Sequence, residues 1–284
     1  MEPSKLLLLD VGGTFIKCSD GREIPVDSDA SAETVRLAFR EAVGDFCRER
    51  ESDRDHAGEF SGGIAVAMPG PFDYGKGIFL MKHKFASVYG EDFRTLAGVP
   101  SCIDLRFTHD VNGMLSGEMA YGNGRGWSRV ALVTLGTGLG FSMCIDGEIL
   151  KNETGSPRIS IFRLPFRDGI LEDYASKRGF LSFYASKGGV AATVRQIAEF
   201  AVEGDSAAKE TFSETGIVIA SAIRDILTEY EIECLLFGGQ ISRSFFLMED
   251  SLKSGLSSVK CLKRICPVSD FDNATFNGLR SLFG

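Results

Sequence analysis

Short apolar runs alternate along the chain with longer segments in which apolar residues recur at helical spacing. An apolar run of four to eight residues that ends in glycine, proline or an acid is typical of a buried strand, and apolar residues three and four apart indicate a helix. The predicted strands are 6–9, 15–18, 63–68, 101–105, a hairpin at 129–150, 234–237 and 260–268. The predicted helices are 31–51, 93–97, 114–121, 170–177, 180–186, 190–202, 207–230, 244–255 and 273–283. Together these elements predict an α/β protein.

The first predicted strand leads into a stretch, Leu6–Lys17, that reads LLLLDVGGTFIK. Four leucines are followed by Asp10 and by the turn Gly12-Gly13-Thr14, after which the chain becomes extended again, so a β-hairpin is predicted. Backbone N–H groups of a glycine turn can point inward and bind an anion. Asp10 can hold a cation beside it, directly or through water, so the stretch suits a magnesium–nucleotide polyphosphate.

The same pattern occurs again when the sequence is shifted by 126 positions, from residue 6 to residue 132. The residues that then coincide without a gap are Leu6, Leu9, Gly12, Phe15, Cys18, Asp20 and Gly21 with Leu132, Leu135, Gly138, Phe141, Cys144, Asp146 and Gly147. Two hairpins of one design indicate two related domains that face a shared ligand. Two unrelated hairpins of similar composition are the alternative.

Composition excludes several other classes of protein. The chain has 284 residues, of which 44% are hydrophobic and 25% charged, as in a soluble globular protein. Its net charge of −8 is spread without long runs of one sign, which argues against nucleic acid as the main partner. No apolar stretch is long enough to span a bilayer, and seven cysteines without zinc-ligand spacing indicate free thiols in the cytoplasm. The sequence leaves the oligomeric state open, including a homodimer.

Three further segments carry candidate chemistry. Asp110 lies where a predicted strand becomes a helix, at the sheet edge where α/β proteins place active sites, although a helix N-cap is the alternative. Pro69-Gly70-Pro71 closes another strand in a stiff turn, and Lys82-His83-Lys84 is a basic cluster near it, which is either a ligand contact or a solvated loop. The second hairpin contains Gly136–Gly140, but a strand follows these glycines, so a dinucleotide fingerprint is disfavoured.

These motifs resemble those of the ROK family (repressors, open reading frames, kinases), which are sugar kinases of the actin-like, hexokinase-type ATPase superfamily. The first hairpin is similar to the family's first phosphate motif, and 135–140 to its second. Asp110 with Gly117-Glu118 resembles the segment that carries the catalytic aspartate. The segment 169–176 resembles the one whose glutamate contacts the sugar, and 236–239 resembles the adenosine motif.

The resemblance implies ATP-dependent phosphorylation of a hexose or hexose derivative, as in glucokinase-like or N-acetylhexosamine kinase-like enzymes, with ATP and Mg²⁺ as cofactors. Asp110 would be the catalytic base, and Asp10 would hold magnesium through water. The residues implied in binding ATP and its phosphates are Asp10, Gly12, Gly13, Thr14, Lys17, Gly136, Thr137, Gly138, Gly238 and Gly239. Those implied in binding the sugar are Pro69, Gly70, His83, His109 and Glu172. For Lys17 a solvent-facing position, and for both histidines a structural role, are the alternatives.

The chain departs from the family pattern at three places. His109 stands where the family has asparagine before the base, the sugar-binding Glu-x-Gly-His is absent from 151–167, and the cysteine-rich zinc loop is missing. The chain has only three histidines, His56, His83 and His109, so no zinc site is expected. The altered sugar loop motivates a competing function, a catalytically weak sensor of sugar or nucleotide.

The implied fold consists of two α/β domains of the actin-like ATPase (ribonuclease H-like) type with the active site in a cleft between them. The first domain is expected at 1–108, with the terminal helix at 271–284 packing back on it, and the second at 109–270. Polyphosphate as the phosphoryl donor is a third possibility, against which the adenosine motif argues. The chain begins almost at once with the first hairpin, so the family's repressor role, which uses an N-terminal helix-turn-helix, is disfavoured.

Overall fold

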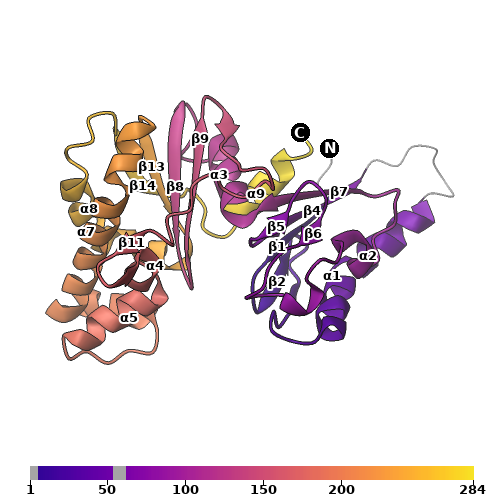
Figure 1. The fold of residues 1–284 in the computed structure, drawn as a ribbon, viewed down its shortest axis with the longest axis horizontal. Helices are drawn as coiled ribbons and strands as arrows, with labels where there is room; N and C mark the ends of the chain where they lie inside the picture. Colours follow the sequence, from indigo (N-terminus) through magenta and orange to yellow (C-terminus); the bar gives the residue numbers. More distant parts are fainter. Residues whose placement is uncertain (1–5, 54–61) are drawn as a thin grey trace. The chain divides into compact units, whose positions relative to one another are not determined.

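The computed structural model describes residues 6–53 and 62–284, which form two compact units that each contain a five-stranded sheet (Figure 1). Unit 1 comprises the described residues up to Ala120, together with 151–156 and 273–284. Unit 2 comprises 121–150 and 157–272. Unit 1 therefore includes 109–120 and 151–156, which the sequence analysis assigned to the second domain.

The sheet of unit 1 has the strand order β3-β2-β1-β4-β7. Its strands are β1 (Leu6–Val11), β2 (Phe15–Cys18), β3 (Glu23–Pro25), β4 (Gly63–Met68) and β7 (Asp104–His109). β1, β2 and β3 are antiparallel neighbours, whereas β1, β4 and β7 run parallel. The remaining elements are α1 (Ala32–Asp53), β5 (Phe72–Asp73), β6 (Ile78–Phe79), η2 (Ala86–Val88), α2 (Phe93–Ala97), α3 (Asp110–Tyr121) and α9 (Ala274–Ser281).

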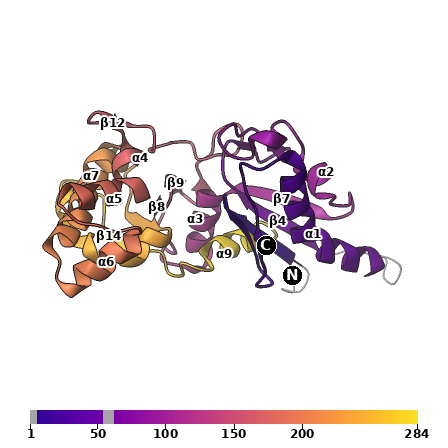
Figure 2. The ribbon, with the colours of Figure 1, turned by 90° about the horizontal axis from the view of Figure 1, so that it is seen from below.

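The four leucines of β1 bury both faces of this sheet. Leu7 and Leu9 belong to the apolar cluster that includes the inner faces of α1 and α2, whereas Leu6 and Leu8 pack with Leu279 of α9 on the other face. Burying a leucine side chain contributes about 1.5–3 kcal/mol, so β1 is a central element of the unit. α9 lies beside α3 in both views (Figures 1 and 2), and the two helices approach closely at glycines 113, 117 and 278.

Unit 2 repeats this sheet order as β10-β9-β8-β13-β14. Its strands are β8 (Arg129–Leu135), β9 (Leu139–Ile145), β10 (Glu148–Ile149), β13 (Cys234–Gly238) and β14 (Arg264–Pro267), with a small hairpin of β11 (Pro165–Phe166) and β12 (Gly169–Ile170). Its helices are α4 (Leu171–Tyr174), α5 (Lys177–Ser186), α6 (Val194–Glu203), α7 (Ser206–Glu229), η3 (Gln240–Leu247) and α8 (Glu249–Gly255). As in unit 1, the strands β8, β9 and β10 are antiparallel neighbours, whereas β13 and β14 run parallel to β8. The two predicted hairpins thus occupy the same place in two sheets of one topology.

Some predicted bounds are wrong for local reasons. The predicted strand 101–105 begins later, as β7, because the Ile103 N–H donates to Pro100 O and closes a turn. The predicted helix 244–255 is the end of η3 followed by α8, because Met248 between them has a non-helical backbone with φ −120°. The helix predicted from 190 begins at Val194, where Thr193 and Gln196 form a capping box.

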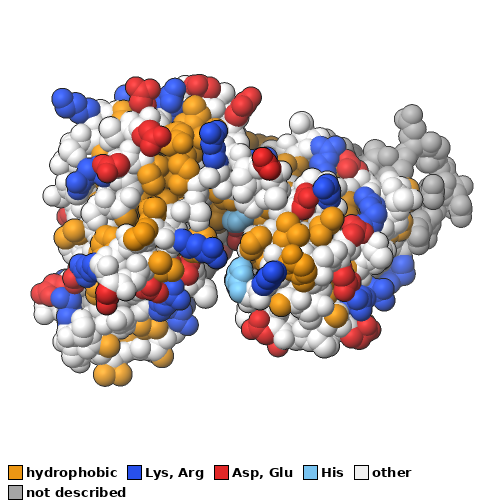
Figure 3. Space-filling model, in the orientation of Figure 1, with side chains coloured by type: hydrophobic (Ala, Val, Ile, Leu, Met, Phe, Trp, Pro, Cys, Tyr) orange, Lys and Arg blue, Asp and Glu red, His pale blue; other side chains and the backbone are white. Residues whose placement is uncertain are grey.

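The surface and the helices give two further observations. On the face shown in Figure 3, acidic and basic side chains are interspersed over both units. No helix among the described residues has the length and apolarity needed to cross a bilayer.

Candidate functional site

Two carboxylates lie at the carboxyl ends of parallel strands in unit 1. Asp10 at the end of β1 pairs in register with Ala67 of β4, which pairs with Thr108 of β7, shortly before Asp110 begins α3. Burial, followed by the charge of Asp110, raises the pKa of Asp10 to about 6, although the charge of Lys17 lowers it in part. A desolvated carboxylate beside a second one is unfavourable without a cation, so Asp10 fits a hard divalent ion.

Asp110 is held ionised by its neighbours. Burial raises the pKa of Asp110, but the charge and the hydrogen bond of His109, and then the hydrogen bond from the Val111 N–H, together lower it by more. The pKa of Asp110 therefore lies below its ordinary value. Asp110 Oδ1 accepts from Val111 N at 2.8 Å and lies 2.7 Å from His109 Nδ1. No hydrogen bond to Oδ2 is found among the described residues, so this oxygen is available to accept a proton from a ligand. The N-cap-like bond and the role of base are therefore compatible.

His109 packs tightly beside Asp110. Its side chain is 17% exposed, and its ring centroid lies 5.8 Å from that of Tyr74, whose hydroxyl donates to Met68 O at 2.8 Å. A β-carbon on Gly70 would come within 3.2 Å of His109 Nε2. Gly70, which follows Pro69 after β4, thus makes room for an imidazole that contacts Asp110 directly. His83 is exposed, and His56 lies outside the described residues.

The turn between β1 and β2 offers free backbone donors. Gly12 N donates to Phe15 O at 2.9 Å, and Gly13 O accepts from Ser28 N at 3.1 Å, so the turn is fixed from both sides. The N–H groups of Gly13 and Thr14 donate to no acceptor within the described part of the chain. Two unpaired, adjacent N–H groups in a fixed turn suit phosphate oxygens. Lys17 pairs with Asp10 across the hairpin and is exposed.

In unit 2 the corresponding turn is braced by Glu172. Its Oε2 accepts from Leu139 N at 2.9 Å, and its Oε1 lies 3.2 Å from the Arg178 guanidinium. A β-carbon on Gly138 would lie 2.9 Å from the same Oε2. Both carboxylate oxygens of Glu172 thus have partners in this structure, on the second phosphate motif and on α5. Gly138 is needed for this close approach.

The turn of the second hairpin and η3, the helix that follows Gly238 and Gly239, border one pocket. Gly239 has φ +81°, and a β-carbon there would lie 2.3 Å from Leu135 O, so only glycine fits behind the Gly238 end of β13. A pocket of about 910 Å³ opens here in unit 2. Its lining includes Gly136, Thr137, Val194, Ala198, Ile241 and Phe246. The turn and the apolar surfaces of α6 and η3 therefore border the same space.

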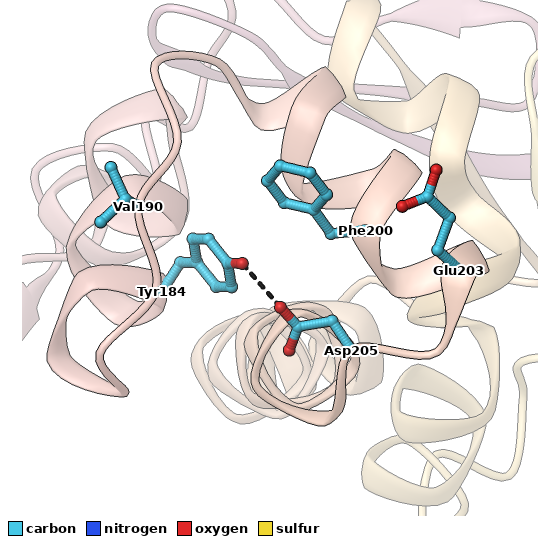
Figure 4. Close-up of a pocket in the computed structure, with 5 residues that line it drawn as sticks. All are labelled: Tyr184, Val190, Phe200, Glu203 and Asp205. Carbon is cyan, nitrogen blue, oxygen red and sulfur yellow. Dashed lines mark hydrogen bonds between the residues drawn. The ribbon is translucent and has the colours of Figure 1, made fainter.

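A second pocket in unit 2 has the character of a structural contact (Figure 4). Tyr184 donates to Asp205 at 2.7 Å, and Asp205 also accepts from Ala208 N at the start of α7. The two polar groups satisfy each other, and the hydrogen bond raises the pKa of Tyr184 and lowers that of Asp205. No group of three or more His, Cys, Asp or Glu side chains arranged to hold a metal occurs among the described residues.

The sequence analysis missed one feature of unit 1. Residues 153–156 read Glu-Thr-Gly-Ser, which matches Glu-x-Gly-His except at the last position, so its Glu and Gly spacing was an available signal. This loop is tied to unit 1, because Tyr74 N donates to Thr154 O at 2.9 Å and Asn112 Nδ2 to Gly155 O at 3.1 Å. Lys84, which the sequence analysis named only as part of a basic cluster, helps through its charge to lower the pKa of Asp110, although burial raises it and His109 and Val111 lower it more.

The repeated sheet order and the paired glycine turns define the two-domain α/β architecture of the actin-like ATPase fold. The ROK family glucokinase from Streptomyces griseus, solved in complex with glucose and AMPPNP, has this fold with a TM-score of 0.74. It is 19% identical, over 97% of this chain and 98% of its own. A ROK family transcriptional regulator, a homologue of the E. coli MLC protein, has a TM-score of 0.76 at 15% identity, over 98% of this chain and 79% of its own.

The chain belongs to the ROK family, whose model matches residues 7–283. N-acetylgalactosamine kinase AgaK of Shewanella sp. (strain ANA-3) is 23% identical over 82% of this chain and 81% of its own. Relatives of this chain thus include sugar kinases, and the family also includes regulators.

Proposed function

We propose that the protein is a sugar kinase that transfers the terminal phosphoryl group of ATP to a hydroxyl of a hexose or hexose derivative. The observation that carries the proposal is the pair Asp10 and Asp110 at one sheet edge, with pKa values moved in opposite directions, beside a turn with free N–H donors. Phosphoryl transfer needs a cation site, donors for the phosphate oxygens and a group that orients the attacking hydroxyl. Unit 1 supplies a residue for each of these needs.

Asp110 is the base in this proposal. Its Oδ2 accepts the proton of the sugar hydroxyl while the hydroxyl oxygen forms a bond to the γ-phosphorus. The bond between the γ-phosphorus and the β,γ-bridging oxygen breaks at the same time, and ADP leaves. His109 keeps the carboxylate ionised and oriented through Oδ1. The Gly13 and Thr14 N–H groups donate to phosphate oxygens.

The oxygen donor and the desolvated position of Asp10 fit Mg²⁺, held directly or through water. When bound, Mg²⁺ neutralises charge on the polyphosphate. The pocket beside Gly136 and Thr137 supports ATP as donor, since the apolar surfaces of α6 and η3 suit a nucleoside. The glucokinase relative was solved with an ATP analogue, which supports the same donor.

For the sugar, the relatives support a hexose or an N-acetylhexosamine. The residues proposed to contact it in unit 1 are Gly70, His109 and the loop 153–156. Glu172 is proposed to contribute mainly by holding the second phosphate turn.

The experiment is an ADP-release screen over hexoses, amino sugars and N-acetylhexosamines with ATP and Mg²⁺, repeated with Asp110→Asn. Removal of a general base costs about 10²–10⁴-fold in rate, so kcat should fall by that factor while ATP binding is retained. Formation of sugar phosphate with polyphosphate in place of ATP would identify polyphosphate as the donor. Binding of a sugar without turnover by the wild-type protein would refute the kinase and favour the sensor.

A further inference from the structure

Lys84 projects from a firmly anchored backbone. The next residue, Phe85, is fully buried, has φ +50° and donates from its N–H to Ser28 O at 2.7 Å. Its ring packs 5.8 Å from that of Phe39. Because Ser28 also donates to Gly13 O, the backbone that carries Lys84 is tied to the backbone of the phosphate turn.

The Lys84 side chain lies against this turn. A β-carbon on Gly13 would lie 3.9 Å from both Cε and Nζ of Lys84, so the ammonium reaches the turn itself. The ammonium is also close enough to Asp110 for its charge to act on that carboxylate. Lys84 thus places a positive charge beside the turn and within electrostatic reach of Asp110.

This ammonium has no ion-pair partner among the described residues. No carboxylate oxygen there lies within 4 Å of its Nζ, although the side chain is half-buried. Lys82 differs, since its Nζ lies 5.3 Å from the centroid of the Tyr89 ring. A half-buried cation without a counter-charge is stabilised by an anionic ligand.

We propose that Lys84 is a catalytic residue that contacts the phosphoryl group during its transfer. This inference rests on the proposed function. The phosphoryl group must pass between the turn that binds phosphate oxygens and the base that receives the hydroxyl proton. A cation in that position stabilises the charge on the equatorial oxygens, which is worth most in the transition state.

The test uses Lys84→Met, which keeps the stem and removes the charge, with Lys84→Arg as the conservative variant and Lys82→Met as the matched control. Loss of one transition-state donor costs about 10²–10³-fold in kcat, so Lys84→Met should fall by that factor with little change in the KM for sugar. Lys84→Arg should recover part of the rate, and Lys82→Met should stay within about twofold of wild type.

A binding measurement separates this inference from the proposed function. Calorimetric titration in the presence of Mg²⁺ measures the Kd for ATP and the Kd for ADP. The ratio of the ADP Kd to the ATP Kd should be lower in Lys84→Met than in wild type by at least about threefold, because only ATP carries the group that Lys84 contacts. A wild-type protein without activity would refute the proposed kinase function. The ratio of the ADP and ATP affinities would still test whether Lys84 contacts the terminal phosphoryl group. An unchanged ratio together with unchanged kcat would refute the role of Lys84. A raised sugar KM at constant kcat would also refute it, since Lys84 would then bind the acceptor.

Discussion

Neutralising Asp10 should stabilise the metal-free protein at neutral pH. A carboxyl group whose pKa rises from 3.8 to about 6 on folding binds protons more tightly in the folded state. Its contribution to stability is therefore fully present below pH 3.8 and is lost as the pH rises through about 6. One pKa unit corresponds to about 1.4 kcal/mol, and Asp10 is partly exposed, so ionisation should cost the folded state about 1–3 kcal/mol.

Asp10→Asn removes this cost and keeps the shape of the side chain. In a chelator, the melting temperature of the variant should equal that of wild type near pH 4 and exceed it at pH 7.5, by about 2–4 °C for each kcal/mol. Differential scanning calorimetry across this pH range measures the difference. Asp29→Asn, an exposed carboxylate of the same unit, is the control and should show no such trend.

Addition of Mg²⁺ should then reverse the order of the two proteins. Wild type gains stability from the ion at pH 7.5, whereas Asp10→Asn gains little, because the amide lacks the charge that holds it. A difference in melting temperature between Asp10→Asn and wild type that is the same at pH 4 and pH 7.5 would refute the burial argument. An Asp10→Asn protein that gains as much stability from Mg²⁺ as wild type would refute the cation site.

Three other predictions concern the turns, the imidazole and the metal content. Gly138→Ala should raise the KM for ATP, because its β-carbon displaces Glu172 from Leu139. Gly136→Ala is the control and should leave the KM unchanged, because a β-carbon there meets no atom within 4 Å. Equal KM values for the two variants would contradict this prediction. His109→Ala should raise the pKa of Asp110 and so move the acidic limb of the kcat–pH profile to higher pH. His109→Asn should move this limb less. Superimposable kcat–pH profiles of wild type and variants would show that the imidazole does not act on Asp110. Purified protein should contain no stoichiometric zinc and keep its activity in a zinc-selective chelator, which elemental analysis checks directly.

The hairpins and most strands were predictable because their signals are local. Four leucines followed by an acid and two glycines define a buried strand, a carboxylate and a turn within one short stretch. The start of β7 was not predictable in this way, because a single bond from Ile103 N to Pro100 O decides it. Apolar composition alone does not distinguish a turn from the first residues of a strand.

The individual contacts of the candidate site were less predictable. Glu172 stands 33 residues after Leu139 in the chain, and only the packing of α4 against the turn joins them. Lys84 was hidden in a basic cluster whose three members have the same appearance in the sequence, and the burial of Phe85 is what directs one of them to the turn. The loop 153–156 was missed because the search was for a histidine, although its Glu and Gly kept their spacing.

The two hairpins, which occupy the same place in two sheets of one strand order, differ in a way that bears on the proposed function. The shift of 126 positions that aligns Gly12 with Gly138 also aligns Asp10 with Gly136, so only the first copy supplies a carboxylate. In the second copy the turn borders a pocket with apolar walls and is fixed by Glu172 from outside the hairpin. A carboxylate at Gly136 would place a negative charge beside a polyphosphate bound there. Under the proposed function, unit 1 would hold the cation and the base and unit 2 the nucleotide, which is the division of roles expected of two similar domains that transfer a phosphoryl group.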